Sequence, residues 1–195
     1  MAEFALPVER LRDDPERFEY EIPAAHWLAR VEASDLDREE APAPLRVELE
    51  ARRVGTDLLL EGTLTGEVGL ECSRCARRYA HALREPFRLV LEPVEGAGSV
   101  EALDEPEGRR GLRENGLCLG EDLEAGWFRG PVIRLGEFFG ELIALAMPIQ
   151  PLCREDCPGI CPHCGADRAE ERCACEDEKV ESPFAVLRRL KESKP

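Results

Sequence analysis

The sequence contains no apolar run that could cross a membrane. A spanning helix needs about 18 consecutive apolar residues, and no segment approaches that length. The N-terminal stretch, MAEFALPVERLRDD, is charged within three residues and lacks an apolar run flanked by basic residues. It does not fit a secretory signal peptide. We therefore expect a cytoplasmic protein that has no membrane partner.

Basic residues are scarce relative to acids. The 26 lysines and arginines face 41 aspartates and glutamates, which gives a formal net charge of −15. Phosphate binding is driven by basic side chains that release counterions. The negative net charge therefore excludes a protein that binds nucleic acid through its whole surface. A DNA partner is not expected, and a basic protein partner is attractive.

One stretch departs from this acidic balance. Between positions 72 and 88, five arginines face the single acid Glu85. A local cluster of this kind can contact RNA phosphates, although the same residues could equally form the solvated face of a hairpin. The candidate RNA-binding residues are Arg74, Arg77, Arg78, Arg84 and Arg88.

Histidine is rare as well, and this limits the enzymes that the chain could be. His26 falls in a predicted short helix, His81 lies in the basic stretch, and His163 lies between two cysteines. No nucleophile lies near a predicted base, and the many acids are scattered. The sequence therefore identifies no catalytic residue, and we expect a protein that is not an enzyme.

Cysteine is abundant, by contrast. Six of the nine cysteines crowd the last quarter of the chain, as Cys153-x3-Cys157-x3-Cys161-Pro-His-Cys164-Gly165 and then Cys173-Ala-Cys175. In the Cys-Pro-x-Cys-Gly knuckle two thiolates can hold one ion while the glycine lets the backbone turn. A disulfide framework is the alternative, but it suits short secreted chains. We therefore predict structural zinc.

Counting ligands predicts how many ions the chain holds. Cys118 stands alone and is expected to be a small buried apolar residue, and His163 occupies the variable position of the knuckle rather than a ligand position. A tetrahedral thiolate site uses four cysteines, so eight fit two zinc ions. These eight form four close pairs: Cys72 and Cys75, Cys153 and Cys157, Cys161 and Cys164, and Cys173 and Cys175.

Two partitions of these pairs are open. In the first, which we prefer, residues 161–175 form a compact local site, and the pair at 153 and 157 meets the distant pair at 72 and 75. The second zinc ion would then attach the C-terminal segment to the body of the protein. In the rival partition, residues 153–164 hold one ion, and Cys72 and Cys75 remain a free or labile pair.

The periodicity of apolar residues predicts an α+β protein with an antiparallel β-rich body. Strands are expected at 4–8, 17–22, 45–53, 57–65, 67–71 and 87–92, with a further strand from 117 toward 128 and a short helix at 24–31. Leu135, Phe138, Phe139, Leu142, Ile143 and Ala146 recur at helical spacing and predict an amphipathic helix at 134–147 that packs on the body.

Changes in composition divide the chain into two parts. Residues 1–148 form the predicted body, and residues 149–195 form a cysteine-rich zinc module followed by a helix at 184–190. From 95 to 116 glycine and acids dominate and apolar residues are sparse. Such a stretch buries too little surface to offset its ordering entropy, so a mobile loop is predicted there.

Several segments resemble the YceD family of bacterial and plastid proteins. They are, in order, LECSRCARRY, LIALAMPIQPLC, CREDCPGICPHCGAD and SPFAVLRRLK, which together cover most of the chain from about residue 70 to 191. The resemblance implies a noncatalytic role in the accumulation of large-subunit ribosomal RNA, through its synthesis, processing or stability. The implied partners are ribosomal RNA, a basic ribosomal protein or an RNA-processing protein.

Two other classes of function stay open. Cys72 and Cys75 could form a redox pair, but thioredoxin-like folds place that motif at the start of a helix after a strand, and a β-meander is predicted here. An RNA-processing enzyme belongs to the same catalytic alternative. The third possibility is a zinc-stabilised scaffold for protein interactions that binds no RNA itself.

Overall fold

The fold is described here from a computed structural model, which describes residues 4–28, 43–96, 103, 105–121, 123–171 and 173–175. The strands are β1 (Ala5–Pro7), β2 (Glu16–Ile22), β3 (Leu45–Val54), β4 (Asp57–Glu71), β5 (Arg78–Pro93), β6 (Leu117–Leu119), β7 (Ala125–Phe128) and β8 (Val132–Arg134). The α-helices are α1 (Ala24–Trp27), α3 (Pro106–Asn115) and α4 (Gly136–Ala146), and the 3-10 turns are η1 (Val8–Arg10) and η2 (Val94–Gly96).

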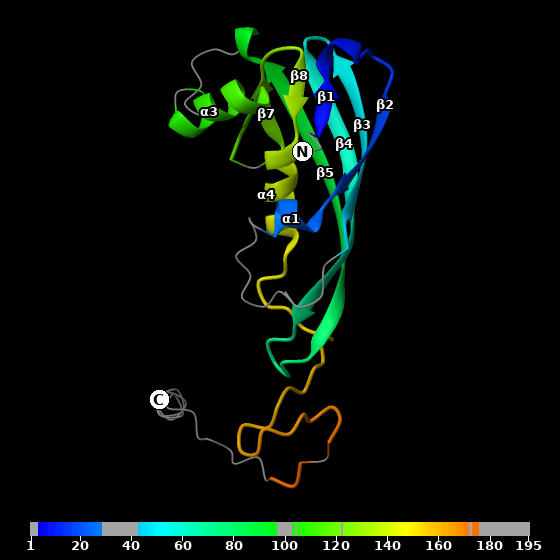
Figure 1. Ribbon diagram of the computed structural model, residues 1–195, viewed down its shortest axis with the longest axis vertical. Helices are drawn as coiled ribbons and strands as arrows, with labels where there is room; N and C mark the ends of the chain where they lie inside the picture. Colours follow the sequence, from blue (N-terminus) through cyan, green and yellow to red (C-terminus); the bar gives the residue numbers. More distant parts are fainter. Residues whose placement is uncertain are drawn as a thin grey trace, which may run out of the picture.

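Six strands form one sheet in the order β2-β3-β4-β5-β7-β6, and β1 pairs with β8 beside it. All neighbours are antiparallel except β5 and β7. Figure 1 shows that β4 and β5 continue well beyond the other strands as a long hairpin. The predicted α+β fold with an antiparallel β-rich body is confirmed.

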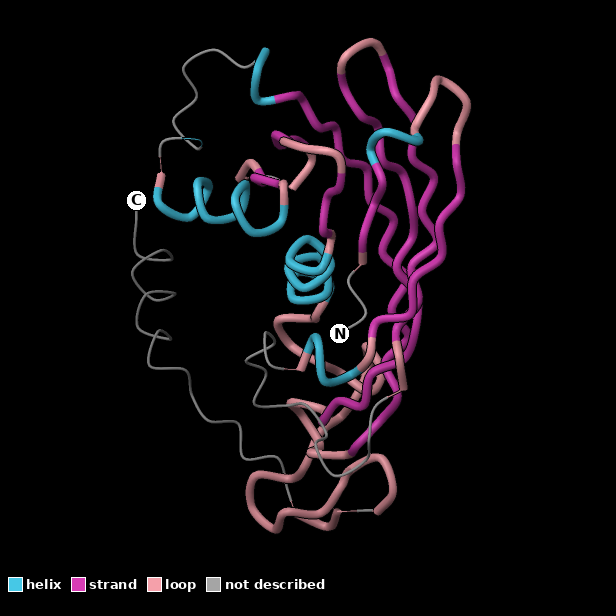
Figure 2. The backbone as a smooth tube through the Cα atoms, turned by 45° about the horizontal axis from the view of Figure 1, so that its top comes forward, coloured by secondary structure: helices cyan, strands magenta, loops and turns pink. Residues whose placement is uncertain are grey.

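Alternation along the strands decides which face of the sheet is buried. In β3, Leu45, Val47, Leu49 and Ala51 are buried while the residues between them are exposed. The buried faces pack against α1 and α4, which both lie on one side of the sheet (Figure 2). The opposite face carries mainly charged side chains. This open face is where the β5 arginines lie.

Helix α4 supplies much of the core, as its predicted apolar spacing required. Phe138, Phe139, Leu142 and Ile143 are buried on the side that faces the sheet, and Trp27 of α1 is fully buried. Helix α4 begins two residues later than predicted because β8 occupies 132–134. None of the helices that the structure describes is long and apolar enough to traverse a bilayer.

The prediction of a mobile loop at 95–116 is wrong for residues 106–115, which form α3. Pro106 stands in the first turn of this helix, where its missing N–H costs nothing, and Gly116 ends it in the left-handed conformation (φ 68°). The one buried leucine, Leu112, holds α3 against the body. A side chain on Gly111 would meet the carbonyl oxygen of Leu117 at 2.5 Å, so glycine lets α3 approach β6 closely.

The remaining strands differ from their predictions in length. Strand β4 runs unbroken through Gly66, where two separate strands were predicted, and β5 begins at Arg78 rather than near Phe87. The segment predicted as one strand from 117 toward 128 is a pair, β6 and β7, with a turn between them. The predicted helix at 184–190 lies outside the described residues.

Candidate metal centres

Two clusters of four cysteines lie at the far end of the β4–β5 hairpin. The inner cluster contains Cys72, Cys75, Cys153 and Cys157, and the outer cluster contains Cys161, Cys164, Cys173 and Cys175. Within each cluster the four sulfur atoms lie within 4.8 Å of one another. The cysteines are therefore grouped as in the first of the two partitions, and the two pairs that the rival partition combines lie in different clusters.

The distances between sulfur atoms fit a tetrahedral metal site. In the inner cluster the Sγ atoms of Cys72 and Cys157 are 3.8 Å apart, as are those of Cys75 and Cys153. In the outer cluster Cys173 lies 3.5 Å from Cys164 and 3.3 Å from Cys161. Four sulfurs at about 2.3 Å from a central ion would be about 3.8 Å apart. All nine cysteines are free thiols.

The first two cysteines of each cluster lie in the same kind of turn. The N–H of Ala76 donates to the carbonyl of Cys72 (2.8 Å), and the N–H of Gly165 donates to the carbonyl of Cys161 (2.9 Å). Both turn residues are left-handed, with φ of 55° for Ala76 and 76° for Gly165. The Cys-Ser-Arg-Cys motif is therefore a second knuckle, although it carries alanine where glycine would be unstrained.

The two clusters differ in exposure. Cys72, Cys75 and Cys157 are buried and pack with Tyr79 and Leu152. Cys164 and Cys175 of the outer cluster are exposed, and only Cys161 there is buried. An ion in the inner cluster would be shielded by the hairpin, while one in the outer cluster would face solvent on one side.

The electrostatics of both clusters suit a cation. Burial alone would raise the pKa of Cys72, but N–H donors from Cys153, Arg74 and Cys75 lower the pKa to about 6. Burial and the neighbouring thiols raise the pKa of Cys153 to about 12. Clustered thiols cannot all ionise without a compensating positive charge, and a bound metal supplies that charge as it displaces the protons.

The outer cluster shows the same division between its thiols. N–H groups of Cys164 and His163 lower the pKa of Cys161 to about 6. The thiols of Cys173 and Cys164 raise the pKa of Cys175 to about 12. His163 contributes its backbone N–H, and its side chain belongs to neither four-sulfur group.

Backbone hydrogen bonds join the tip of the β4–β5 hairpin, residues 72–77, to the C-terminal segment that begins at 149. The N–H of Ser73 donates to the carbonyl of Pro151 (2.9 Å), and the N–H of Ile160 donates to the carbonyl of Arg74 (3.0 Å). Gly159 is left-handed (φ 73°), and a Cβ there would lie 2.9 Å from the same Arg74 oxygen. The two segments therefore meet through close backbone contact.

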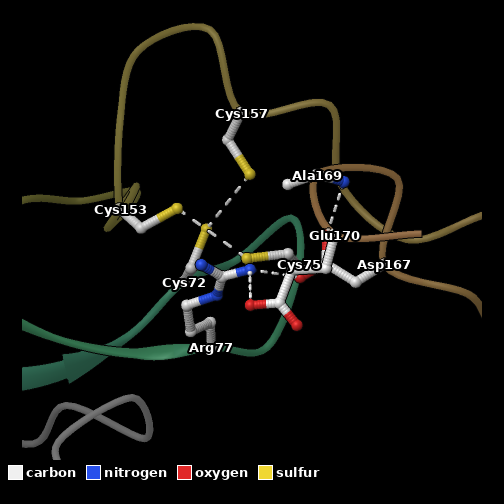
Figure 3. A network of polar contacts seen from close by, with 8 residues as sticks. All are labelled: Cys72, Cys75, Arg77, Cys153, Cys157, Asp167, Ala169 and Glu170. Carbon is white, nitrogen blue, oxygen red and sulfur yellow. Dashed lines mark hydrogen bonds and ion pairs between the residues drawn. The ribbon is translucent and has the colours of Figure 1, made fainter. Parts of the chain in front are cut away.

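Two of the candidate RNA-binding arginines take part in this junction. Arg74 donates from Nη1 to the carbonyls of Glu155 (3.2 Å) and Cys157 (3.0 Å). Arg77 pairs with Asp167 (2.7 Å) and Glu170 (2.8 Å), as Figure 3 shows beside the inner cluster. The N–H of Ala169 and the guanidinium of Arg77 lower the pKa of Asp167. Sequence reasoning missed this acidic pair, because ordinary solvated acids leave the same signal.

The other three candidate arginines lie along β5. Arg78, Arg84 and Arg88 are all exposed and have the same parity in the strand, so they point to the open face of the sheet. Arg88 lies 3.6 Å from Glu61, and Thr65 stands opposite Arg84. The structure thus separates the five arginines into two at the junction and three along the strand.

The histidines occupy structural positions. His26 lies 3.0 Å from the Gly136 carbonyl and against the ring of Phe4, and His81 packs edge-on to Tyr79. Cys72 and Cys75 lie in a turn between antiparallel strands rather than at the start of a helix. Cys118 is buried, as predicted.

Comparisons with known proteins identify relatives of this chain. A family model described as "Large ribosomal RNA subunit accumulation protein YceD" matches residues 60–191. An uncharacterized protein of Mycobacterium tuberculosis is 31% identical over 133 residues, which cover 66% of this chain and 54% of that protein.

Two plant relatives carry descriptive names. The "Large ribosomal RNA subunit accumulation protein YCED homolog 1, chloroplastic" of Arabidopsis thaliana is 26% identical over 159 residues, 76% of this chain and 49% of that protein. The protein of the same name in Zea mays is 23% identical over 148 residues, 71% of this chain and 50% of that protein. The chain spans about half the length of the curated relatives it matches. No solved structure shows a significant match.

Proposed function

Because the chain belongs to the YceD family of large ribosomal RNA subunit accumulation proteins, we propose that it promotes the accumulation of large-subunit ribosomal RNA as a noncatalytic binding factor. The observation that carries this proposal is the family match over residues 60–191, which includes the hairpin tip and all eight clustered cysteines. In this proposal the cysteine clusters stabilise the fold that binds the partner. The protein acts in the cytoplasm on RNA, a ribosomal protein or an RNA-processing protein.

We propose zinc as the ion in both clusters. Sites of four thiolates in tetrahedral arrangement select zinc or an iron–sulfur centre, and closely spaced cysteine pairs that supply four thiolates are typical of structural zinc. Each cluster offers four ligands and leaves no position for a reacting water, which favours a structural role over a catalytic one.

The protein purified without chelator is expected to contain two zinc ions per chain by elemental analysis. A strong chelator should remove the outer ion first, because Cys164 and Cys175 are exposed while three of the four inner thiols are buried. The amount of zinc released after addition of the chelator should therefore rise with time in a fast and a slow phase of equal size. Iron in place of zinc would contradict the proposed metal, and a single ion would contradict two sites.

We propose that Arg78, Arg84 and Arg88 contact RNA phosphates, while Arg74 and Arg77 hold the hairpin to the C-terminal segment. The first and last of these arginines are ten residue steps apart in β5, about 34 Å, on a face that the helices leave open (Figure 2). The position opposite Arg84 is Thr65, which also stands opposite Arg46 of β3, so two arginines flank one neutral residue.

Changing Arg78, Arg84 and Arg88 together to alanine should weaken binding to precursor ribosomal RNA and flatten its salt dependence. Each lost phosphate contact lowers the slope of log affinity against log salt by about 0.7–0.9, so the triple variant should lose about two to three units. The matched control is alanine at Arg10, Arg113 and Arg129, which are exposed and lie outside β5. Equal losses in both variants would show that only net charge matters, and the proposed contacts would then be wrong.

A noncatalytic role predicts no turnover by the pure protein. Four clustered thiols that held the proposed ion would not be free to reduce a disulfide. Reduction of insulin, or cleavage of labelled precursor RNA, by the zinc-loaded protein would favour the enzymatic alternatives. Enrichment with precursor particles but no binding to isolated RNA would instead favour a protein scaffold.

A further inference from the structure

A groove of about 710 Å³ lies between α3, β6 and α4. Helices α3 and α4 lie on one side of the sheet, and β6 is the edge strand of that sheet (Figure 2). The parity of Arg78, Arg84 and Arg88 in β5 places these side chains on the opposite face. Leu117, Leu119 and Leu123 contribute apolar lining, and Gly108 and Gly111 line the α3 side. The groove is therefore separate from both cysteine clusters and from the proposed RNA surface.

One wall of the groove is a regular stripe along α4. Glu137, Glu141 and Leu145 follow one another at four-residue intervals, so they lie on one face of the helix over about 12 Å. The opposite face of α4 is buried in the core. Leu145 is 72% exposed. The stripe thus offers two carboxylates and one uncovered apolar side chain.

The rim of the groove is acidic, with four glutamates and one arginine among its lining residues. Glu107 and Glu121 join the two α4 glutamates, and Arg110 is the basic residue among the lining side chains. Within the described part of the chain, none of these four glutamates takes part in an ion pair. RNA phosphates would be repelled here, whereas cationic side chains would be attracted.

We propose that this groove binds a basic segment of a protein partner, in which arginines or lysines flank a bulky apolar side chain. The apolar residue would contact Leu145 and the leucine lining, and the cations would face Glu137 and Glu141. This mode resembles the docking of an amphipathic segment into a hydrophobic groove whose charged rim selects the sign of the partner. It goes beyond the proposed RNA contacts, because it gives the protein a second, protein-binding face.

The proposal can be tested with the full-length, zinc-loaded protein and a fluorescent peptide of about 15 residues that alternates paired arginines with leucine and alanine. Anisotropy titrations at low salt should show binding that weakens about three- to tenfold in the Glu137→Gln/Glu141→Gln variant, as expected for two surface ion pairs. Leu145→Ala should weaken binding by a similar factor through lost apolar contact. A peptide with the leucines replaced by serine should bind the wild-type protein more weakly.

The matched control is Glu19→Gln/Glu48→Gln, which removes the same charge from the open face of the sheet. This control variant should keep the affinity of the wild-type protein for the peptide. An equal loss in the control would assign binding to the net charge of −15 and overturn the proposal, as would unchanged affinity of both groove variants. RNA binding measured in parallel should be unaffected by the groove changes, so failure of this inference is distinguishable from failure of the proposed RNA contacts.

Discussion

Replacing Cys72 by serine is expected to release one zinc ion per chain and to lower the free energy of unfolding by about 4 kcal/mol. Cys72 belongs to the inner cluster, which joins the hairpin tip to residues 153 and 157. The ion there would act as a cross-link between segments separated by 85 residues at Cys72 and Cys157. Breaking such a link raises the conformational entropy of the unfolded chain. For a loop of this length, that lowers the free energy of unfolding by several kcal/mol.

The local consequence should be as clear as the global one. Without the inner ion, the contacts of Ser73 with Pro151 and of Ile160 with Arg74 lose their anchor. Limited proteolysis should therefore cut the variant near residue 152 faster than it cuts the wild-type chain. The outer cluster at 161–175 should keep its ion, because all four of its ligands are local.

Two other cysteine variants serve as controls. Cys118→Ala changes a buried cysteine that belongs to neither cluster, so both ions should remain and stability should fall by about 1 kcal/mol. Cys161→Ser should release one ion without exposing residue 152, because the inner link stays intact. Full retention of zinc by Cys72→Ser would show that the inner cluster is not a metal site.

The sequence predicted those elements whose apolar residues follow a clear period. Strand β3 and helix α4 were found because one face of each is almost wholly apolar. Helix α3 was missed because Leu112 is its one buried side chain, so its sequence shows almost no apolar period. Its capping signals, Pro106 and Gly116, were present and could have identified it.

The long hairpin was harder to predict for a related reason. The first half of β5 alternates exposed residues with Tyr79 and His81, which are only partly buried, so its pattern lacks a strong apolar face. Strand β5 pairs with β4 through fourteen consecutive residue pairs, from Arg78 to Leu91, and this pairing makes its first half a strand. The signal therefore depends on the partner strand as well as on the local sequence.

The metal centres divide into a local part and a distant part. The spacing of Cys161, Cys164, Cys173 and Cys175 predicts the outer cluster, because all four lie within fifteen residues. The inner cluster depends on where the hairpin tip lies relative to residues 153–157, and spacing alone left two partitions open. The roles of Arg74 and Arg77 followed only from their contacts with the C-terminal segment.

Replacing Phe139 by alanine should lower the free energy of unfolding by about 3–5 kcal/mol. Its ring is fully buried and packs against Phe4, Tyr20 and Phe138, at centroid distances of 5.6, 5.5 and 5.7 Å. The small side chain would leave a cavity between α4 and the sheet and remove these ring contacts. Since 1 kcal/mol shifts the melting temperature of a chain of this size by about 2–4 °C, melting followed by circular dichroism should fall by roughly 10 °C.

This variant also tests the proposed division into a body at 1–148 and a zinc module at 149–195. The outer cluster lies outside the core that contains Phe139, so the folded variant should keep two zinc ions, and its outer ion should resist release while the body melts. Leu145→Ala, on the exposed side of the same helix, is the control and should change stability by less than about 0.5 kcal/mol. Release of both ions together with melting of the body would mean that the two parts unfold as one unit, because the junction through Arg74, Arg77 and Gly159 would then couple the metal centres to the core.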